Sequence, residues 1–126
     1  METKGKRVLL VEDDRFLRRA CEASLRQLGL IVLTAIDGEE ALQLARAELP
    51  DLILLDLLMP KLPGVKVLRT LKAEEKTCGI PVLVLSNSSR EQDMREVVSL
   101  GAVGYWVKAD LSLKELGDRV MRILEG

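Results

Sequence analysis

Short apolar runs that end in carboxylates constrain the fold of this chain more than any other feature. Residues 52–55 are apolar at every position and are followed by Asp56, and residues 8–11 are followed by Glu12 and Asp13. A short run without a polar position is typical of a parallel strand buried on both faces. Parallel strands bring their carboxyl ends to one edge of the sheet, where α/β proteins bind ligands. The sequence therefore predicts an anionic pocket at that edge, which must bind a cation or hold protons.

Apolar runs alternate with helical patterns along the whole chain. We expect strands at residues 8–11, 30–33, 52–55, 82–85 and 103–107. The helices between them carry recognisable ends. The expected end signals are Asp14 and Gly29 for the first helix, Asp37 with Glu40 and then Leu49-Pro50 for the second, Pro63-Gly64 for the third, Ser88-Ser89 and Gly101 for the fourth, and Ser112 with Glu115 for the fifth.

Five strands alternating with five helices predict an α/β fold with right-handed crossovers and a central parallel sheet. The last strand contains Gly104, Tyr105 and Trp106, which suggests a sheet edge. With 48% hydrophobic and 31% charged residues, the chain has the composition of a globular domain. We expect one domain over residues 1–126, with no output domain after the last helix.

The composition argues against several classes of function. The net charge is −1 without a cluster of Lys and Arg, which disfavours a nucleic-acid interface and membrane-surface binding. No apolar stretch approaches the ~20 residues of a membrane span. The chain has no His, so it has no His base, no His-ligated zinc and no phosphohistidine. Cys21 and Cys78 lack metal-type spacing, and we expect reduced cytosolic thiols packed as small apolar groups.

Polar groups at the other strand ends extend the predicted pocket. Ser86 follows the fourth strand and Lys108 follows the fifth. If the first and third strands are neighbours, the three carboxylates converge into a set of hard oxygen ligands that suits Mg²⁺. Lys108 would add a positive charge and Ser86 a hydrogen bond to a phosphate oxygen. Asp56 could then act as a nucleophile that forms an acyl phosphate.

Each of these residues also has a purely structural interpretation. Asp13 or Asp14 could cap the first helix, and Asp14 is the better candidate. Taken alone, Ser86 is a loop serine, Lys108 a solvated cation and Tyr105 an edge-strand aromatic, while Phe16 is expected to pack partly on the first helix. The functional interpretation depends on complementary groups at four strand ends together.

The chain resembles the receiver domain of bacterial two-component response regulators, of the single-domain chemotaxis-regulator type, over essentially its whole length. The matching motifs are Val11-Glu12-Asp13-Asp14, Asp56-Leu57-Leu58-Met59-Pro60 with Gly64, Leu85-Ser86, and Tyr105-Trp106-Val107-Lys108. They are specific because they lie on four strands in the family's order. The resemblance implies a flavodoxin-like doubly wound sheet with strand order 2-1-3-4-5, for which a chemotaxis regulator is a standard example.

The resemblance also implies a role for each matching residue. Asp56 corresponds to the phosphoacceptor, Ser86 to the hydroxyl residue, Lys108 to the site lysine and Tyr105 to the switch aromatic. The acidic pair is Glu12 and Asp13. The implied Mg²⁺ ligands are Asp13, Asp56 and the backbone carbonyl of Leu58, with Glu12 acting through water.

The function implied by the resemblance is signalling by phosphorylation. Asp56 takes a phosphoryl group from a phosphohistidine on a histidine kinase or histidine phosphotransferase, so the chain promotes only its own phosphorylation and dephosphorylation. Ser86 and Lys108 then move inward and Tyr105 rotates, which alters the face of the fourth helix, fifth strand and fifth helix where a target protein docks. A cytoplasmic monomer or weak dimer is expected.

The sequence departs from the family pattern at two positions, and three alternative functions remain. Ala109 follows Lys108 where the family usually has a cis proline; without proline a cis bond costs ~2.5–4 kcal/mol, so a trans bond is expected. Asn87 stands where a small residue is common in the family, and could crowd or hydrogen-bond the phosphate.

The alternative functions are a degenerate receiver that binds partners without phosphorylation, a phosphohydrolase, and a nucleotide- or flavin-binding module. Leu58 replaces the general acid of the phosphohydrolases, and no Gly-rich loop follows the first strand.

Overall fold

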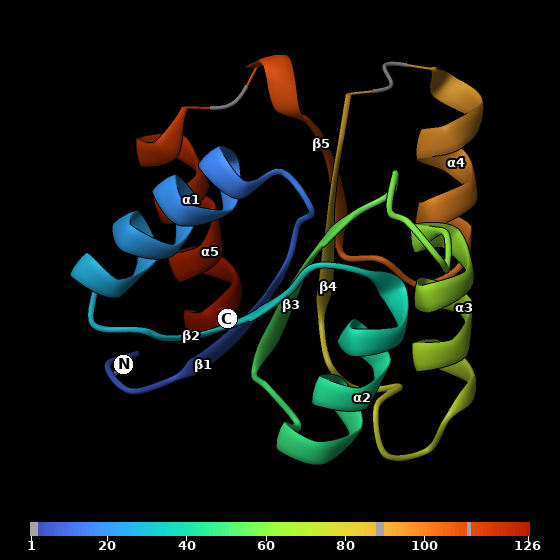
Figure 1. The fold of residues 1–126 in the computed structure, drawn as a ribbon, viewed down its shortest axis with the longest axis horizontal. Helices are drawn as coiled ribbons and strands as arrows, with labels where there is room; N and C mark the ends of the chain where they lie inside the picture. Colours follow the sequence, from blue (N-terminus) through green and yellow to red (C-terminus); the bar gives the residue numbers. More distant parts are fainter. Residues whose placement is uncertain (1–2, 88–89, 111) are drawn as a thin grey trace.

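The computed structural model describes residues 3–87, 90–110 and 112–126. Five parallel strands form one sheet in the order β2-β1-β3-β4-β5. Helices α1 and α5 cover one face of the sheet, and α2, α3 and α4 cover the other (Figure 1). The elements are β1 (Arg7–Val11), α1 (Arg15–Gln27), β2 (Ile31–Ala35), α2 (Gly38–Glu48), β3 (Leu52–Asp56), α3 (Gly64–Ala73), β4 (Val82–Ser86), α4 (Glu91–Ser99), β5 (Gly104–Val107), a 3₁₀ turn (Lys108–Asp110) and α5 (Leu113–Glu125). The predicted fold and strand order are confirmed.

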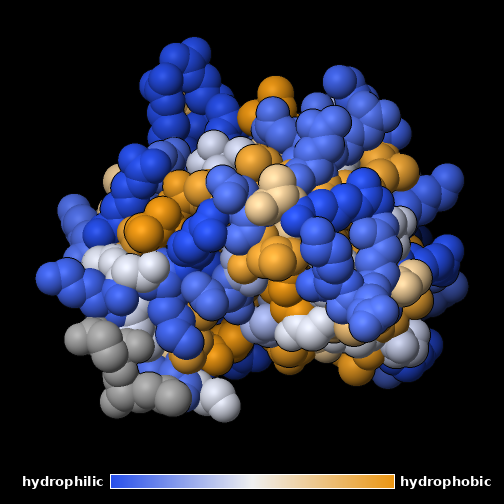
Figure 2. All heavy atoms as spheres, turned by 90° about the horizontal axis from the view of Figure 1, so that it is seen from below, coloured by the Kyte–Doolittle hydropathy of each residue, from blue (hydrophilic) through white to orange (hydrophobic). Residues whose placement is uncertain are grey.

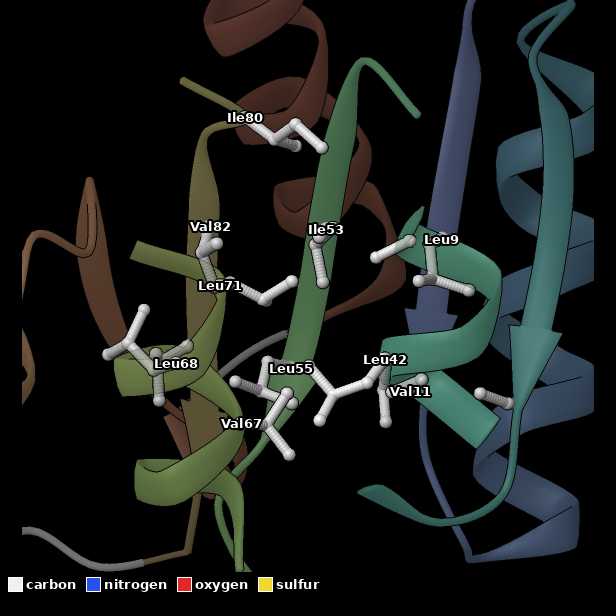
Figure 3. Close-up of a cluster of buried hydrophobic side chains, with 14 of the residues drawn as sticks. Leu9, Val11, Leu42, Ile53, Leu55, Val67, Leu68, Leu71, Ile80 and Val82 are labelled. Carbon is white, nitrogen blue, oxygen red and sulfur yellow. The ribbon is translucent and has the colours of Figure 1, made fainter. Parts of the chain in front are cut away.

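The apolar strands are buried on both sides because each face of the sheet has its own core. All five residues of β3 and of β4 are buried. Leu9, Ile53, Leu55 and Val82 point toward α2 and α3 (Figure 3). Alternate residues of the same strands pack against α1 and α5 on the opposite face. Each fully buried aliphatic side chain contributes about 1.5–3 kcal/mol, so these two layers hold the sheet edge in a fixed position.

The pairing of β1 with β3 places the two acidic strand ends side by side. Val11 pairs with Leu55 in parallel register, so the next residues along the two strands, Glu12 and Asp56, lie at the same edge. On the other side of β1, Val11 pairs with Ala35 of β2. The first and third strands are therefore neighbours, which is the arrangement that convergence of the three carboxylates required.

Three helices begin at the predicted capping residues. Asp14 accepts hydrogen bonds from the backbone N–H groups of Phe16 and Leu17, which confirms it as the N-cap of α1. The carboxylate of Asp37 and the hydroxyl of Ser112 likewise cap α2 and α5. Because Asp14 is the cap, Asp13 is free of that structural role and its side chain faces solvent.

Several boundaries differ from the predicted ones, and those of β1, β3, β4 and β5 differ by one residue each. Strand β2 runs from Ile31 to Ala35 instead of over residues 30–33, because pairing with β1 continues through the polar Thr34. A polar residue is tolerated there since β2 is an edge strand that is only partly buried. Pro63 occupies the N-cap of α3, before the first turn instead of within it. The predicted start of α4 at Ser88-Ser89 lies outside the described residues.

Two packing expectations were wrong. Phe16 is 85% exposed. The buried side of α1 is set by Cys21 and Leu25, four residues apart, with Leu17 half-buried one turn earlier. Phe16 is rotated about 100° from Leu17 around the helix and so faces solvent. Cys78 is exposed, whereas Cys21 is buried as expected.

The two thiols should therefore react at very different rates. Burial and the nearby Glu12 carboxylate raise the pKa of the Cys21 thiol to about 11. At pH 8 only about one thousandth of such a thiol is thiolate, and thiolate is the reactive form. We expect a chromogenic disulfide reagent to titrate one fast thiol in the native protein, lost in Cys78→Ser, and two in denaturant. Two equally fast native thiols would contradict the burial of Cys21.

The surface shows no single large apolar face in the view of Figure 2, where hydrophobic side chains lie in small groups among hydrophilic ones. The exposed large hydrophobic residues include Leu28, Ile31 and Leu49 at the amino ends of the strands and Phe16 and Leu58 near their carboxyl ends. Among the described residues, no helix is both long and apolar enough to span a bilayer.

Candidate functional site

Three carboxylates meet at the carboxyl edge of the sheet. Glu12 and Asp13 leave the end of β1, and Asp56 is the last residue of β3. One oxygen atom from each residue lies within 4.8 Å of the others. Glu12 and Asp56 are buried while Asp13 is exposed, so the cluster opens to solvent on the Asp13 side. The predicted convergence of these residues is confirmed.

Lys108 neutralises part of this negative charge. Its ammonium group lies 2.6 Å from Glu12 Oε1 and 3.0 Å from Asp56 Oδ2. Lys108 comes from the turn after β5, and its long side chain extends past the intervening β4 to reach β1 and β3. Burial opposes the charge on this lysine, but the hydrogen bonds to Glu12 and Asp56 outweigh it, so the pKa of Lys108 is raised. The ammonium therefore stays protonated between the two carboxylates.

Glu12 is held at both of its carboxylate oxygens. Oε1 accepts the hydrogen bond from Lys108, and Oε2 accepts one from the backbone N–H of Asp14 at 3.1 Å. Burial nevertheless raises the pKa of the Glu12 carboxyl, and the Asp56 charge adds to the rise. An added cation would relieve the repulsion between these carboxylates.

Asp56 is presented by a tight connection between β3 and α3. Its side chain accepts a hydrogen bond from the backbone N–H of Leu58 at 3.2 Å, and the residue is 5% exposed. The connection folds back so closely that a Cβ on Gly64 would lie 2.6 Å from the Asp56 carbonyl oxygen. Only glycine fits at this position, which explains the Gly64 of the sequence motif.

The remaining predicted residues lie on β4 and β5. Ser86 ends β4, next to β3, and is 1% exposed. Tyr105 is half-buried on β5 and packs against the core cluster on the α2–α3–α4 side. Asn87 is exposed. No cis peptide occurs among the described residues, in agreement with the trans bond expected before Ala109.

The donor set fits a small hard cation. Carboxylate oxygens are the ligands preferred by Mg²⁺, which usually binds one or two carboxylates and retains several waters. An exposed Asp13 beside the buried Glu12 and Asp56 leaves room for such waters. The acidic cluster therefore has the chemistry of a magnesium site.

Sequence reasoning missed one residue at this site. The guanidinium of Arg18 on α1 donates hydrogen bonds to the backbone carbonyls of Glu12 at 2.9 Å and Asp13 at 3.3 Å. The helical pattern predicts that Arg18 lies one turn after the Asp14 cap, but it does not predict the direction of its side chain.

Comparisons with known proteins agree with this geometry. The sequence profile of the response regulator receiver domain matches residues 8–120. A probable transcriptional regulator ycf27 of Guillardia theta is 40% identical over 98% of this chain and 47% of its own length. The alkaline phosphatase synthesis transcriptional regulatory protein PhoP of Bacillus subtilis is 38% identical over 95% of this chain and 49% of its own. The chain thus spans about half the length of these curated relatives.

Solved structures share the whole fold. A putative response regulator from Chloroflexus aurantiacus has a TM-score of 0.89 and 31% identity, covering 98% of this chain and 100% of that one. The chemotaxis response regulator CheY4 of Vibrio cholerae has a TM-score of 0.87 and 26% identity, covering 95% of this chain and 99% of that one.

Proposed function

The chain belongs to the response regulator receiver domain family, and from this we propose that Asp56 accepts a phosphoryl group from a phosphohistidine on a partner kinase or phosphotransferase. The observation that carries the proposal is the contact of Lys108 with both Asp56 and Glu12 beside the acidic cluster. As a receiver domain, the chain is a signalling regulator. In this proposal residues 1–126 act as one receiver domain.

The phosphoryl transfer is a substitution at phosphorus. A carboxylate oxygen of Asp56 attacks, an O–P bond forms, and the N–P bond to the partner's imidazole breaks with the electron pair returning to the nitrogen. Lys108 supports this step as a fixed cation beside the attacking carboxylate, and the Ser86 hydroxyl donates a hydrogen bond to a phosphoryl oxygen. The partner must supply the histidine because this chain has none.

Mg²⁺ would be held by Asp13, Asp56 and the backbone carbonyl of Leu58, with Glu12 acting through water. When bound, the cation supplies positive charge that offsets the phosphoryl oxygens. Oxygen atoms of Glu12, Asp13 and Asp56 within 4.8 Å of one another support this choice.

Phosphorylation is proposed to change the surface formed by α4, β5 and α5. A phosphoryl group on Asp56 draws Lys108 and Ser86 toward it, and the half-buried Tyr105 moves into the space that opens. Two exposed apolar residues of this region, Val98 on α4 and Val103 before β5, are available to a protein target. The change is a shift between two populated packings of one fold.

The direct test is labelling by a small phosphodonor. We expect acetyl phosphate to add one phosphoryl group in the presence of Mg²⁺ and none in EDTA, as measured by intact-protein mass spectrometry. Lack of labelling in a folded protein would favour the degenerate receiver. Continuous release of phosphate from unrelated phosphomonoesters would favour the phosphohydrolase.

We also predict a long-lived phosphoryl group. Hydrolysis requires a water in line with the acyl phosphate, and the apolar Leu58 side chain cannot hold one. Ser88, two residues after Ser86 in the sequence, is a second position that could flank the phosphate, and it lies outside the described residues. Leu58→Asn is expected to accelerate decay of the phosphoprotein severalfold in a gel-based decay assay.

Because Leu58 is exposed, its effect on water near the phosphate can be tested without a large change in packing. Its side chain is 70% exposed, so Leu58→Asn should leave thermal stability nearly unchanged. Leu58→Ala is the matched control, because it shortens the side chain without adding a hydrogen-bonding group. An unchanged decay rate in Leu58→Asn, or wild-type decay within seconds, would refute the prediction.

A further inference from the structure

The three carboxylates of the site are held to different degrees. Lys108 and a backbone N–H group fix each of Glu12 and Asp56. The Asp13 carboxylate is exposed and makes no hydrogen bond or ion pair with any described residue. Asp13 is nevertheless a proposed direct ligand of the cation, and a freely rotating ligand would weaken binding through its loss of conformational entropy.

Arg18 restrains the backbone on both sides of Asp13. Nη1 of Arg18 donates to the carbonyl oxygen of Glu12 at 2.9 Å and to that of Asp13 at 3.3 Å. These two carbonyls belong to the peptide units before and after the Asp13 Cα. Because each peptide unit is planar, fixing both units fixes the φ and ψ angles of Asp13, and the direction of its Cα–Cβ bond with them.

The position of Arg18 is itself well defined. Its backbone N–H bonds to the carbonyl of Asp14, the N-cap, so it belongs to the first turn of α1. The side chain is half-buried, and its planar guanidinium carries several donors in a rigid arrangement. The helix therefore provides a rigid support from which one side chain holds the loop.

We propose that Arg18 is a positioning residue that orients the Asp13 carboxylate for binding of a divalent cation. This role rests on the proposed function, because it assumes that the acidic cluster binds Mg²⁺. The positioning role predicts that loss of Arg18 weakens Mg²⁺ binding, which is the opposite of what the loss of a nearby positive charge alone would do. Removing a positive charge near the site would strengthen cation binding, whereas releasing the Asp13 backbone would weaken it.

The test compares Mg²⁺ affinities of variants by isothermal titration calorimetry. Loss of a residue that supports a metal ligand typically costs 10–100-fold in affinity, so we expect Arg18→Ala to bind Mg²⁺ about tenfold more weakly. Arg18→Lys retains the charge but replaces the planar guanidinium by a shorter side chain with a freely rotating ammonium, and should fall between wild type and Arg18→Ala. Arg19→Ala removes the same charge from the exposed neighbouring position and should remain within about twofold of wild type.

A measurement without metal completes the test. In the metal-free protein we expect NMR order parameters of the Asp13 and Asp14 amides to fall in Arg18→Ala and to remain unchanged in Arg19→Ala. Mg²⁺ binding by Arg18→Ala as tight as or tighter than wild type, or equal weakening in Arg19→Ala, would overturn the positioning role alone. Wild-type protein that binds no Mg²⁺ would overturn the proposed metal site, and the role of Arg18 with it.

Discussion

Asp56→Asn protein is expected to take up no phosphoryl group from acetyl phosphate under conditions that label the wild type to one group per chain. The amide of asparagine is not a nucleophile. Among the described residues, Lys108 contacts one other carboxylate, that of Glu12, which directly follows β1. Glu12 is 2% exposed and engaged at both oxygens, so it does not replace Asp56.

The matched control for this variant is Asp51→Asn. Asp51 directly precedes β3, at the opposite end from Asp56, where its carboxylate accepts a hydrogen bond from the backbone N–H of Arg7 at 2.8 Å. Both substitutions remove one negative charge, but only Asp56 lies at the carboxyl edge of the sheet. Mass spectrometry should show full labelling of Asp51→Asn. Labelling of a folded Asp56→Asn protein at the wild-type level would refute the phosphoacceptor assignment.

The second large effect is a loss of Mg²⁺ affinity, which we expect for substitution of Asp13 and not for substitution of the neighbouring Asp14. Asp13→Asn removes one of the three charges of the acidic cluster, and we expect Mg²⁺ affinity to fall more than ~10-fold, or over ~1.4 kcal/mol. Asp14 caps α1 through two backbone N–H groups, and asparagine caps almost as well. Asp14→Asn should therefore retain Mg²⁺ affinity and lose less stability than the ~0.5–2 kcal/mol that replacing a cap by alanine costs.

Calorimetric Mg²⁺ titration and thermal denaturation of both variants separate the roles. The two substitutions are chemically identical and adjacent in sequence, so a general charge effect would change both affinities alike. Weaker Mg²⁺ binding in Asp14→Asn than in Asp13→Asn would show that the ligand choice is wrong.

Much of this architecture could be predicted from local patterns. A fully apolar run such as that of β3 is compatible with burial on both faces, and its end marks Asp56 as a residue at the sheet edge. The caps Asp14 and Ser112 could be read because side-chain capping involves residues only two or three positions apart. The extension of β2 through Thr34 could not be predicted in this way, because it depends on pairing with β1. Thr34 pairs there with Leu10, which lies 24 residues earlier in the sequence.

By itself, the sequence determined the order of the elements and which residues stand at the strand ends, because both depend on short-range periodicity. Only the tertiary structure decided how those residues meet. The contact between Lys108 and Glu12 joins residues 96 positions apart and requires β1, β3, β4 and β5 to lie in one order. The direction of Arg18 toward the Asp13 backbone and of Phe16 toward solvent was likewise decided by the rotation of α1 on the sheet, which core packing sets.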